Sequence, residues 1–434
     1  MRQQRPWHPV LAPGVRAREV WAWAMFDFAN SGYTTVVISA IFNAYFVAVV
    51  AGNAPWATLA WTTTLGVSYL LIALTAPVLG AFADRYACKK ALLGATTLGC
   101  IIFTAALALV DPGEMALAIV CLIAANFFFG SGENMIAAFL PELAHEDDLG
   151  KVSGWGWGLG YVGGIVTLGI CLAYVTAAQA RGESAQAFVP WTLLITAAIF
   201  AVGSLPTFLL LKERSRPQSG QSGEGVFAES IARLRMTLTH LRRYRDLAWF
   251  LVCVLFYQSG VQTVITLAAV YAEQAMRFST AQTITLILVV NVAAGMGAVA
   301  FGHVQDRLGH KRTLALILVG WIVMVVLASY SQDRVTFWIA AHIAGLCLGS
   351  SQSAARALVG YLSPVDRRAE FFGLWGLSVK LSSILGPVTY GILVGLSHGE
   401  HRVAFLATGI YFLAGLAILA GINVARGRQA AVVG

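Results

Sequence analysis

Four ionisable residues stand inside stretches of the sequence that are otherwise apolar. Asp27 and Glu133 lie in the first half of the chain, and Arg356 and Lys380 lie in the second half. A charged side chain in a membrane span is costly, so it usually faces the protein interior and serves a ligand, a proton or a partner charge. At 1.5 Å per residue the two acids lie ~10–12 Å deep, and Lys380 lies ~15 Å deep. This pattern predicts substrate binding at all four residues and proton coupling at Asp27 and Glu133.

Each of the four residues also has a structural alternative. Asp27 would serve as a hydrated carboxylate near the membrane surface, and Glu133 would pair with hydroxyls or with a loop cation. The similar depths of the two acids would let them face each other across the first half. Arg356, about one turn into its apolar run, would snorkel to the surface. Lys380 is too deep to snorkel, so its alternative is a buried ion pair, with Asp27 or Glu133 as the partner across the cleft.

Neutral polar and aromatic residues occur in the spans that would line a central cavity. Such side chains can hydrogen-bond a solute, although they also join helices in any bundle. A glycine-rich run over 154–164 predicts close helix packing, and its Trp155 and Trp157 are predicted as interfacial anchors. The remaining predicted substrate-binding residues are Asn30, Tyr33, Tyr257, Gln258, Gln262, Gln352 and Trp375.

One charged loop occurs twice, at the same place in each half of the chain. Both copies follow the pattern G-x-x-x-D-R-x-x-x-K-[KR] and stand between apolar runs. Two copies separated by half a chain indicate a duplicated unit, as in repeat-built transporters. We predict that these residues form a conformational switch whose contacts hold one state and are released in another. They are Gly80, Asp84, Arg85, Lys89 and Lys90 in the first copy, and Gly302, Asp306, Arg307, Lys311 and Arg312 in the second.

The composition requires a membrane protein with several spans. Of the 434 residues, 58% are hydrophobic and only 12% are charged, and the mean hydropathy is +0.72. A soluble chain of this length could not cover its surface with so few polar groups. The six cysteines stand singly, so neither a metal site, a cofactor nor a disulfide framework is predicted. The net charge of +8 follows from membrane topology and does not indicate nucleic acid.

The predicted fold is an all-α membrane protein with twelve transmembrane helices in two pseudo-symmetric six-helix bundles. Most of the apolar runs reach the ~20 residues that a membrane span needs. Lys and Arg concentrate on one side of this topology, which places both termini in the cytoplasm and anionic lipids beside the exposed cations. The domains are 1–211, a cytoplasmic linker with an interfacial amphipathic helix over 212–246, and 247–434. The predicted spans are 20–50, 57–83, 90–110, 114–140, 152–178, 188–211, 247–273, 280–303, 312–330, 335–361, 370–396 and 402–425.

The duplicated loop resembles the signature loop between the second and third helices of major facilitator superfamily transporters, and its echo between the eighth and ninth. Further stretches resemble the branch typified by the vacuolar amino-acid effluxers of autophagy and their bacterial relatives. This resemblance implies no catalysis. It implies a monomer in the bacterial inner membrane that moves a small zwitterionic or carboxylate metabolite, such as an amino acid or peptide, by alternating access and proton-coupled efflux. The further stretches are 23–31, 138–144, 260–264 and 370–380.

Two departures from that branch bear on coupling and ligand. Ser259 stands where the family often has an acidic residue, and Ala137 stands where it often has asparagine. The first departure shifts proton coupling to Asp27 and Glu133, and both favour a ligand unlike that of the vacuolar exporters. Two other functions remain open from the sequence, a lipid or lysolipid flippase of the same fold and a membrane-embedded lipid-modifying enzyme.

Overall fold

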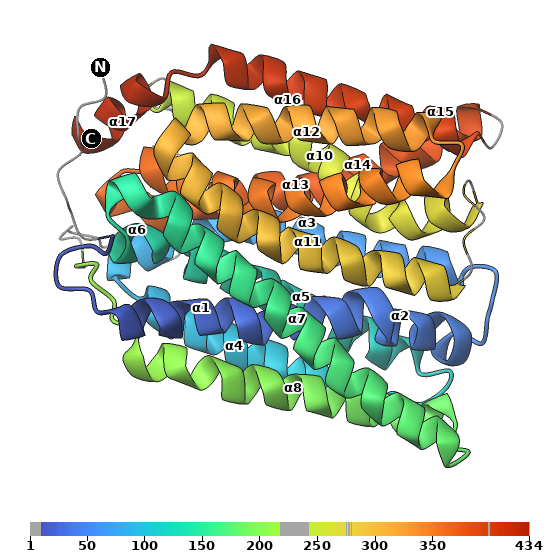
Figure 1. Cartoon of the computed structure of the whole chain (residues 1–434). Coiled ribbons are helices and arrows are strands. Elements are labelled where there is room, and N and C mark those ends of the chain that lie inside the picture. Colours follow the sequence, from blue (N-terminus) through green and yellow to red (C-terminus); the bar gives the residue numbers. More distant parts are fainter. Residues whose placement is uncertain are drawn as a thin grey trace.

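The computed structural model describes residues 10–217, 243–274, 276, 278, 280–397 and 400–433. Within them, long helices lie side by side in one bundle (Figure 1), and Leu11 and Ala144 form an isolated β-bridge. The first half comprises α1 (Ala17–Tyr33), η1 (Thr34–Ala40), α2 (Phe42–Tyr45), η2 (Phe46–Val50), α3 (Ala57–Tyr86), α4 (Lys89–Ala106), η3 (Leu107–Leu109), α5 (Met115–Ala137), α6 (Leu140–Leu143), η4 (Glu146–Asp148), α7 (Leu149–Ala180) and α8 (Ala185–Leu210). The second half comprises α10 (Arg245–Gln274), α11 (Thr280–Leu308), α12 (His310–Tyr330), α13 (Arg334–Leu362), η5 (Val365–Arg367), α14 (Arg368–Leu396), α15 (His401–Ala407), α16 (Gly409–Gly421) and α17 (Val424–Val433).

Eleven helical spans in the described residues are long and apolar enough to cross a membrane. The long helix α13 is not among them, although it has 29 residues and occupies the span predicted over 335–361. Its residues 349–360 are all buried, so Ser350, Gln352 and Arg356 face protein and do not need to be apolar. The all-helical membrane fold is confirmed. The count of twelve spans and the cytoplasmic termini stay predictions.

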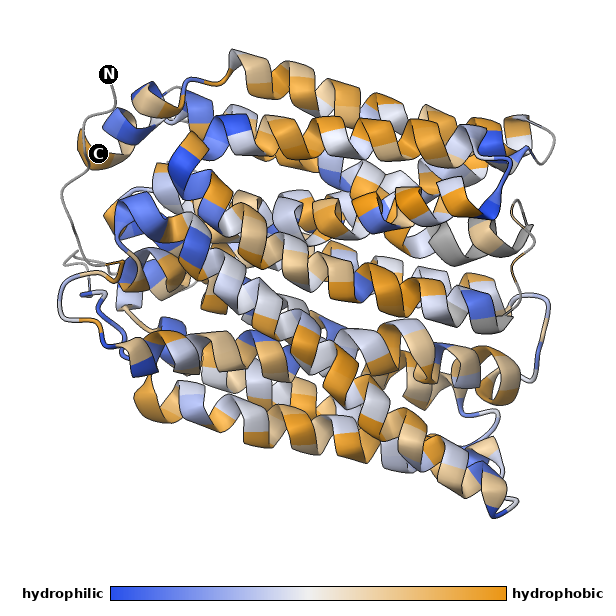
Figure 2. Ribbon diagram, viewed as in Figure 1, coloured by the Kyte–Doolittle hydropathy of each residue, from blue (hydrophilic) through white to orange (hydrophobic). Residues whose placement is uncertain are grey.

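Figure 2 shows why the bundle suits a membrane, because hydrophobic residues cover the lengths of the helices and hydrophilic residues gather near their two ends. In hydrocarbon every backbone group must be bonded internally, which a helix achieves alone. α6 and α17 lie at one end of the bundle (Figure 1), close to the duplicated loops. We call this the motif end. The amphipathic helix predicted in the linker falls on residues 218–242, which lie outside the described residues.

The duplicated loop makes a short helix-to-helix turn with a positive φ in both halves. In the first copy Ala87 connects α3 to α4 with a φ of 49°, and in the second copy Gly309 connects α11 to α12 with a φ of 88°. Ala87 has the left-handed αL conformation that commonly ends a helix, whereas Gly309 has a ψ of 154° and a conformation that a glycine adopts readily. Each turn therefore starts a new helix at the cations that end the motif.

The two halves meet at the motif end along two helix pairs. α3 packs on α14, and α7 packs on α11, and Figure 1 shows α7 and α11 side by side near the motif end. The first glycine of each motif permits this approach, because a Cβ at Gly80 would collide with the Ala369 carbonyl, and one at Gly302 would collide with the Gly150 carbonyl. Small residues at such contacts let helix backbones come close. The motif is therefore an interface between the halves.

Candidate functional site

Lys380 and Glu133 form an ion pair between the two halves. Lys380 Nζ on α14 donates to Glu133 Oε2 on α5 over 3.1 Å. The Glu133 side chain is 31% exposed, whereas that of Lys380 is 11% exposed. The carboxylate is therefore partly exposed, and it lies on the opposite half from its cation. Of the two partners left open by the sequence, the structure places Glu133 beside Lys380.

Arg356 and Asp27 form a second ion pair between the halves, and this pair is more enclosed. Arg356 Nη1 on α13 donates to Asp27 Oδ2 on α1 over 2.7 Å. The same guanidinium donates to the hydroxyl and the carbonyl of Ser153, over 3.1 and 2.8 Å. The rings of Trp23 and Trp157 lie 4.6 and 5.4 Å from it. Arg356 thus has a hydrogen-bonded and aromatic surrounding that fixes the pair in place.

Three interpretations from the sequence need correction at this pair. Arg356 does not snorkel, because its side chain is 3% exposed and its charge is met by Asp27 inside the bundle. Asp27 and Glu133 pair with different cations and not with each other. Trp157 lies against the Arg356 guanidinium and is therefore not a headgroup anchor. No pattern in the sequence marks Ser153 as a hydrogen-bond partner of Arg356.

The neutral residues predicted to bind substrate are spread over several helix contacts. Gln258 on α10 donates from Nε2 to Gln352 Oε1 on α13 over 2.9 Å, inside the second half. Tyr33 packs against the Phe129 ring at 4.9 Å between centroids, and Tyr257 is fully buried. These side chains join helices in this conformation. Of the others, Asn30 and Trp375 are buried and Gln262 is half-buried.

The motif carboxylates bind the first turns of helices from the opposite half. Asp84 Oδ2 accepts the backbone N–H of Glu370 on α14 over 2.8 Å. Asp306 accepts the backbone N–H groups of Gly150 and Lys151 on α7, each over 2.9 Å. A helix N-terminus has free N–H donors and a partial positive charge, so it favours a carboxylate. Two equivalent contacts, one from each half, hold the motif end together.

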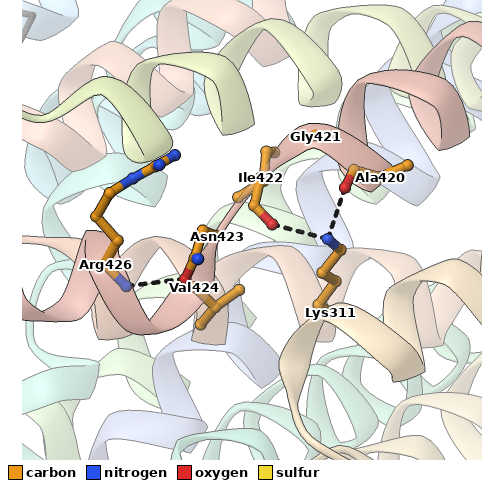
Figure 3. Close-up of a pocket in the computed structure, with 7 residues that line it drawn as sticks. All are labelled: Lys311, Ala420, Gly421, Ile422, Asn423, Val424 and Arg426. Atoms are coloured by element: carbon orange, nitrogen blue, oxygen red, sulfur yellow. Dashed lines mark hydrogen bonds between the residues drawn. The ribbon is translucent and has the colours of Figure 1, made fainter.

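A lysine of each motif binds the end of the last long helix in its own half. Lys90 Nζ donates to the Leu211 carbonyl over 2.6 Å. Lys311 Nζ donates to the carbonyls of Ala420 and Ile422, each over 2.8 Å, beside a surface pocket of about 400 Å³ (Figure 3). Cations stabilise helix C-termini in this way. Arg85 is half-buried, and Arg307 and Arg312 are exposed.

The comparisons with known proteins agree with this geometry. A sequence model described as "Vacuole effluxer Atg22 like" matches residues 49–432. The chain belongs to the Atg22-like family. It is 28% identical over 405 residues to the uncharacterized MFS-type transporter YxiO of Bacillus subtilis, covering 92% of this chain and 93% of that protein. It is 25% identical over 331 residues to autophagy-related protein 22-1 of Aspergillus fumigatus, covering 70% of this chain and 54% of that protein. The chain thus spans about half the length of this fungal relative.

Solved structures share the fold of this Atg22-like chain. The human organic anion transporter MFSD10 superposes with a TM-score of 0.70 at 16% identity, over 93% of this chain and 99% of that one. The proton:xylose symporter XylE superposes with a TM-score of 0.70 at 13% identity, over 92% of this chain and 94% of that one. The protein is therefore an integral membrane transporter of the major facilitator superfamily, in its Atg22-like branch.

The Atg22-like chain also has a set of ion pairs that its sequence did not reveal. Lys89 pairs with the buried Glu142, which lies in one of the stretches that carried the resemblance. Glu19 at the start of α1 accepts from Arg214 over 2.8 Å. Asp246 at the start of α10 pairs with Arg426 over 2.7 Å. In each half, therefore, an ion pair joins the segment that follows the last long helix (α8 or α16) to the start of the first helix (α1 or α10).

A metal site is not evident in the part of the chain that the structure describes. Among the described residues, no group of three or more His, Cys, Asp or Glu side chains could hold a metal ion. The site consists of charged pairs, hydrogen-bonding side chains and aromatic rings. Such groups can bind a polar solute and respond to its charge without covalent chemistry.

Proposed function

We propose that this protein is a secondary transporter that moves a small zwitterionic or carboxylate metabolite, such as an amino acid or peptide, by alternating access. The observation that carries the proposal is the Lys380–Glu133 pair, in which opposite charges from the two halves meet at a partly exposed carboxylate. A zwitterion can satisfy both charges at once, and its binding would then couple to movement of the halves.

The proposed direction of transport rests on the family, and the proposed proton coupling rests on the two acids. The family description names a vacuole effluxer, which is the ground for proposing efflux, and we place the protein in the bacterial inner membrane. Glu133 and Asp27 supply carboxylates that can change protonation when their partner cations move away. With the motif end in the cytoplasm, the contacts of Asp84 and Asp306 would close the cytoplasmic side in this conformation. We take the working unit to be a monomer in contact with anionic lipids.

Transport in proteoliposomes tests the proposal. The purified protein should exchange radiolabelled amino acids in a saturable manner, and an imposed pH gradient should drive net transport. A thermal-shift screen of amino acids, short peptides, organic acids and lysolipids should show stabilisation by the transported class. Stabilisation by lysolipids alone, without amino-acid exchange, would replace this proposal with the flippase.

A further inference from the structure

The ammonium group of Lys380 occupies a pocket that the first half builds. Its Nζ lies 3.1 Å from Glu133 Oε2, 5.6 Å from the centroid of the Tyr69 ring and 5.9 Å from that of Phe129. Tyr69 comes from α3, and Phe129 and Glu133 come from α5. The cation therefore reaches across from α14 to a carboxylate and two aromatic rings. We call Tyr69, Phe129 and Glu133 the ammonium cage.

Contacts within the first half hold the Phe129 ring and fix α3 and α5, the two helices that carry the cage. The Phe129 ring packs on the buried Tyr33 ring with 4.9 Å between centroids. One turn from the cage, Asn126 on α5 donates to Ser68 on α3 over 2.6 Å, which ties the two helices together. None of these contacts uses a side chain of the second half, so the cage can persist when α14 moves.

A glycine leaves room for the occupant. A Cβ at Gly130 would lie 3.1 Å from Cε of Lys380 and closer still to Ile72. A larger residue would crowd the stem that carries the ammonium, because such contacts are tighter than ordinary packing allows. The cage thus provides a negative charge, two ring faces and space for a methylene chain.

These groups recognise a primary ammonium. Ring faces attract cations within about 6 Å, and a carboxylate adds a charge-assisted hydrogen bond. A primary ammonium can donate that bond, whereas a quaternary ammonium has no N–H. Lys380 belongs to the opposite half, so separation of the halves at α14 would withdraw it and leave the cage to another cation.

We propose that the ammonium cage binds the primary ammonium group of the transported ligand, with Lys380 as its built-in competitor. The ligand's ammonium would take the place of the Lys380 ammonium, and the displaced Lys380 would meet the ligand's carboxylate. This inference rests on the proposed function, because the cage opens to a ligand only when the halves move. It makes Tyr69, Phe129 and Gly130 specificity-determining residues.

Chemical rescue tests the cage directly. Lys380→Ala removes Cγ through Nζ, and n-propylammonium replaces those four atoms. We expect n-propylammonium chloride at millimolar concentrations to raise the thermal unfolding midpoint of the purified variant in a saturable manner, by about 3 °C or more. Sodium chloride, n-propanol and tetramethylammonium chloride at equal concentrations should raise it less. Lys380→Met fills the cage with an uncharged chain and is the matched control, which should not respond.

A second variant assigns the response to the cage. Lys380→Ala combined with Glu133→Gln should lose the rescue, and an equal rise in both variants, or no rise in Lys380→Ala, would overturn the proposal. If Lys380→Ala unfolds without additive, its yield in n-propylammonium is compared with its yield in n-propanol, and equal yields would also overturn it. No transport is measured here, so failure leaves alternating access standing. Rescue without amino-acid transport in the wild type would instead contradict the proposed function alone.

Discussion

The two inter-half ion pairs differ in their surroundings, although each joins an acid of the first half to a cation of the second. The Glu133 side chain is 31% exposed, which leaves part of its carboxylate open to a ligand in the proposed function. The Asp27 side chain is 11% exposed, and its partner Arg356 lies between two indole rings. Burial without a partner is costly for a charge. Asp27 is therefore suited to locking the halves, and Glu133 to meeting the ligand.

Neutralising the two acids should separate these roles. Asp27→Asn leaves the Arg356 guanidinium buried without a counter-charge, which costs roughly 3–5 kcal/mol when a buried pair is broken. Glu133→Gln leaves the buried Lys380 ammonium beside a neutral amide that can still accept its hydrogen bond, so a smaller cost of about 1–3 kcal/mol is expected. Both variants should lose transport driven by a pH gradient, and Glu133→Gln should also weaken substrate exchange, because Glu133 meets the ligand's ammonium in the proposed function. The measurements are thermal unfolding and proteoliposome flux, and a wild-type protein indifferent to pH gradients would remove the proton-coupling role.

Lys380 should discriminate ligands by charge. Its ammonium lies between the halves and, in the proposed function, meets the ligand's carboxylate. Lys380→Ala should weaken binding of zwitterions by at least 10-fold, an estimate of about 1.4 kcal/mol for one charge-assisted contact. Esters of the same amino acids, which lack that carboxylate, should keep their affinity or bind more tightly, because the variant also removes the competitor from the ammonium cage. Lys380→Arg should restore little, because a planar guanidinium does not fit an ammonium position. Equal losses for both ligand classes, measured by calorimetry, would mark Lys380 as a structural ion-pair residue.

At the scale of helices, the contacts of α7 show what the glycine-rich run does. Gly154 faces the Ala298 backbone of α11 in the second half, whereas Gly156 faces the Asp27–Arg356 pair and Gly163 faces the Phe28 backbone of α1. α7 thus presents glycines on two faces, one toward α1 of its own half and one toward α11 of the other half. A seam of this kind lets helices slide with little steric resistance.

The turn between α3 and α4 contains a natural reporter of its surroundings. Burial, with Glu213 and Asp84 adding to it, raises the pKa of the Cys88 thiol from 9.0 to about 11. The other five cysteines are buried. Because the thiolate is the reactive form, maleimide labelling at pH 8 should be roughly 100-fold slower than for an ordinary cysteine. The rate should rise about 10-fold for each pH unit up to the pKa.

Glu213→Gln tests the cause of that slow labelling. Removing a negative neighbour should lower the pKa of Cys88 and speed its labelling at pH 8, as mass spectrometry would show. Cys88→Ser is the control and should leave the protein unlabelled. Wild-type labelling at the rate of a free thiol would show that the turn is open in solution.

At the scale of the molecule, the sequence predicts what depends on composition and repetition. The duplicated motif and the apolar runs were enough for the all-helical membrane fold, and the depth of Lys380 left Asp27, Glu133 or the ligand as its partner. The partner of Arg356 was not predictable, because snorkelling and pairing across halves fit the same position in a helix. The pairs Glu19–Arg214 and Asp246–Arg426 join residues about 180 or more apart, and no local pattern marks them.

The duplicated geometry leads to a prediction about the switch as a whole. Asp84 and Asp306 each bind a helix N-terminus of the other half, so both should favour the same closed state. Removing the charge of such a carboxylate costs about 0.3–1 kcal/mol at each helix end, which shifts the equilibrium roughly 2–5-fold. Asp84→Asn and Asp306→Asn should each reduce transport without loss of expression, and the free-energy shifts should add in the double variant because both act on one equilibrium.

Asp306→Asn gives the sharper reading of this switch, because Asp306 lies in the second half and Cys88 in the first. Asp84 joins the turn that carries Cys88 to α14, so separation of the halves should uncover that turn and speed Cys88 labelling by the same 2–5-fold. The matched control is Asp333→Asn, since Asp333 accepts the backbone N–H of Thr336 within its own half. That variant loses the same kind of contact but should leave labelling and transport unchanged. If Asp306→Asn labels and transports like the wild type, the motif contacts are structural and do not set the balance between states.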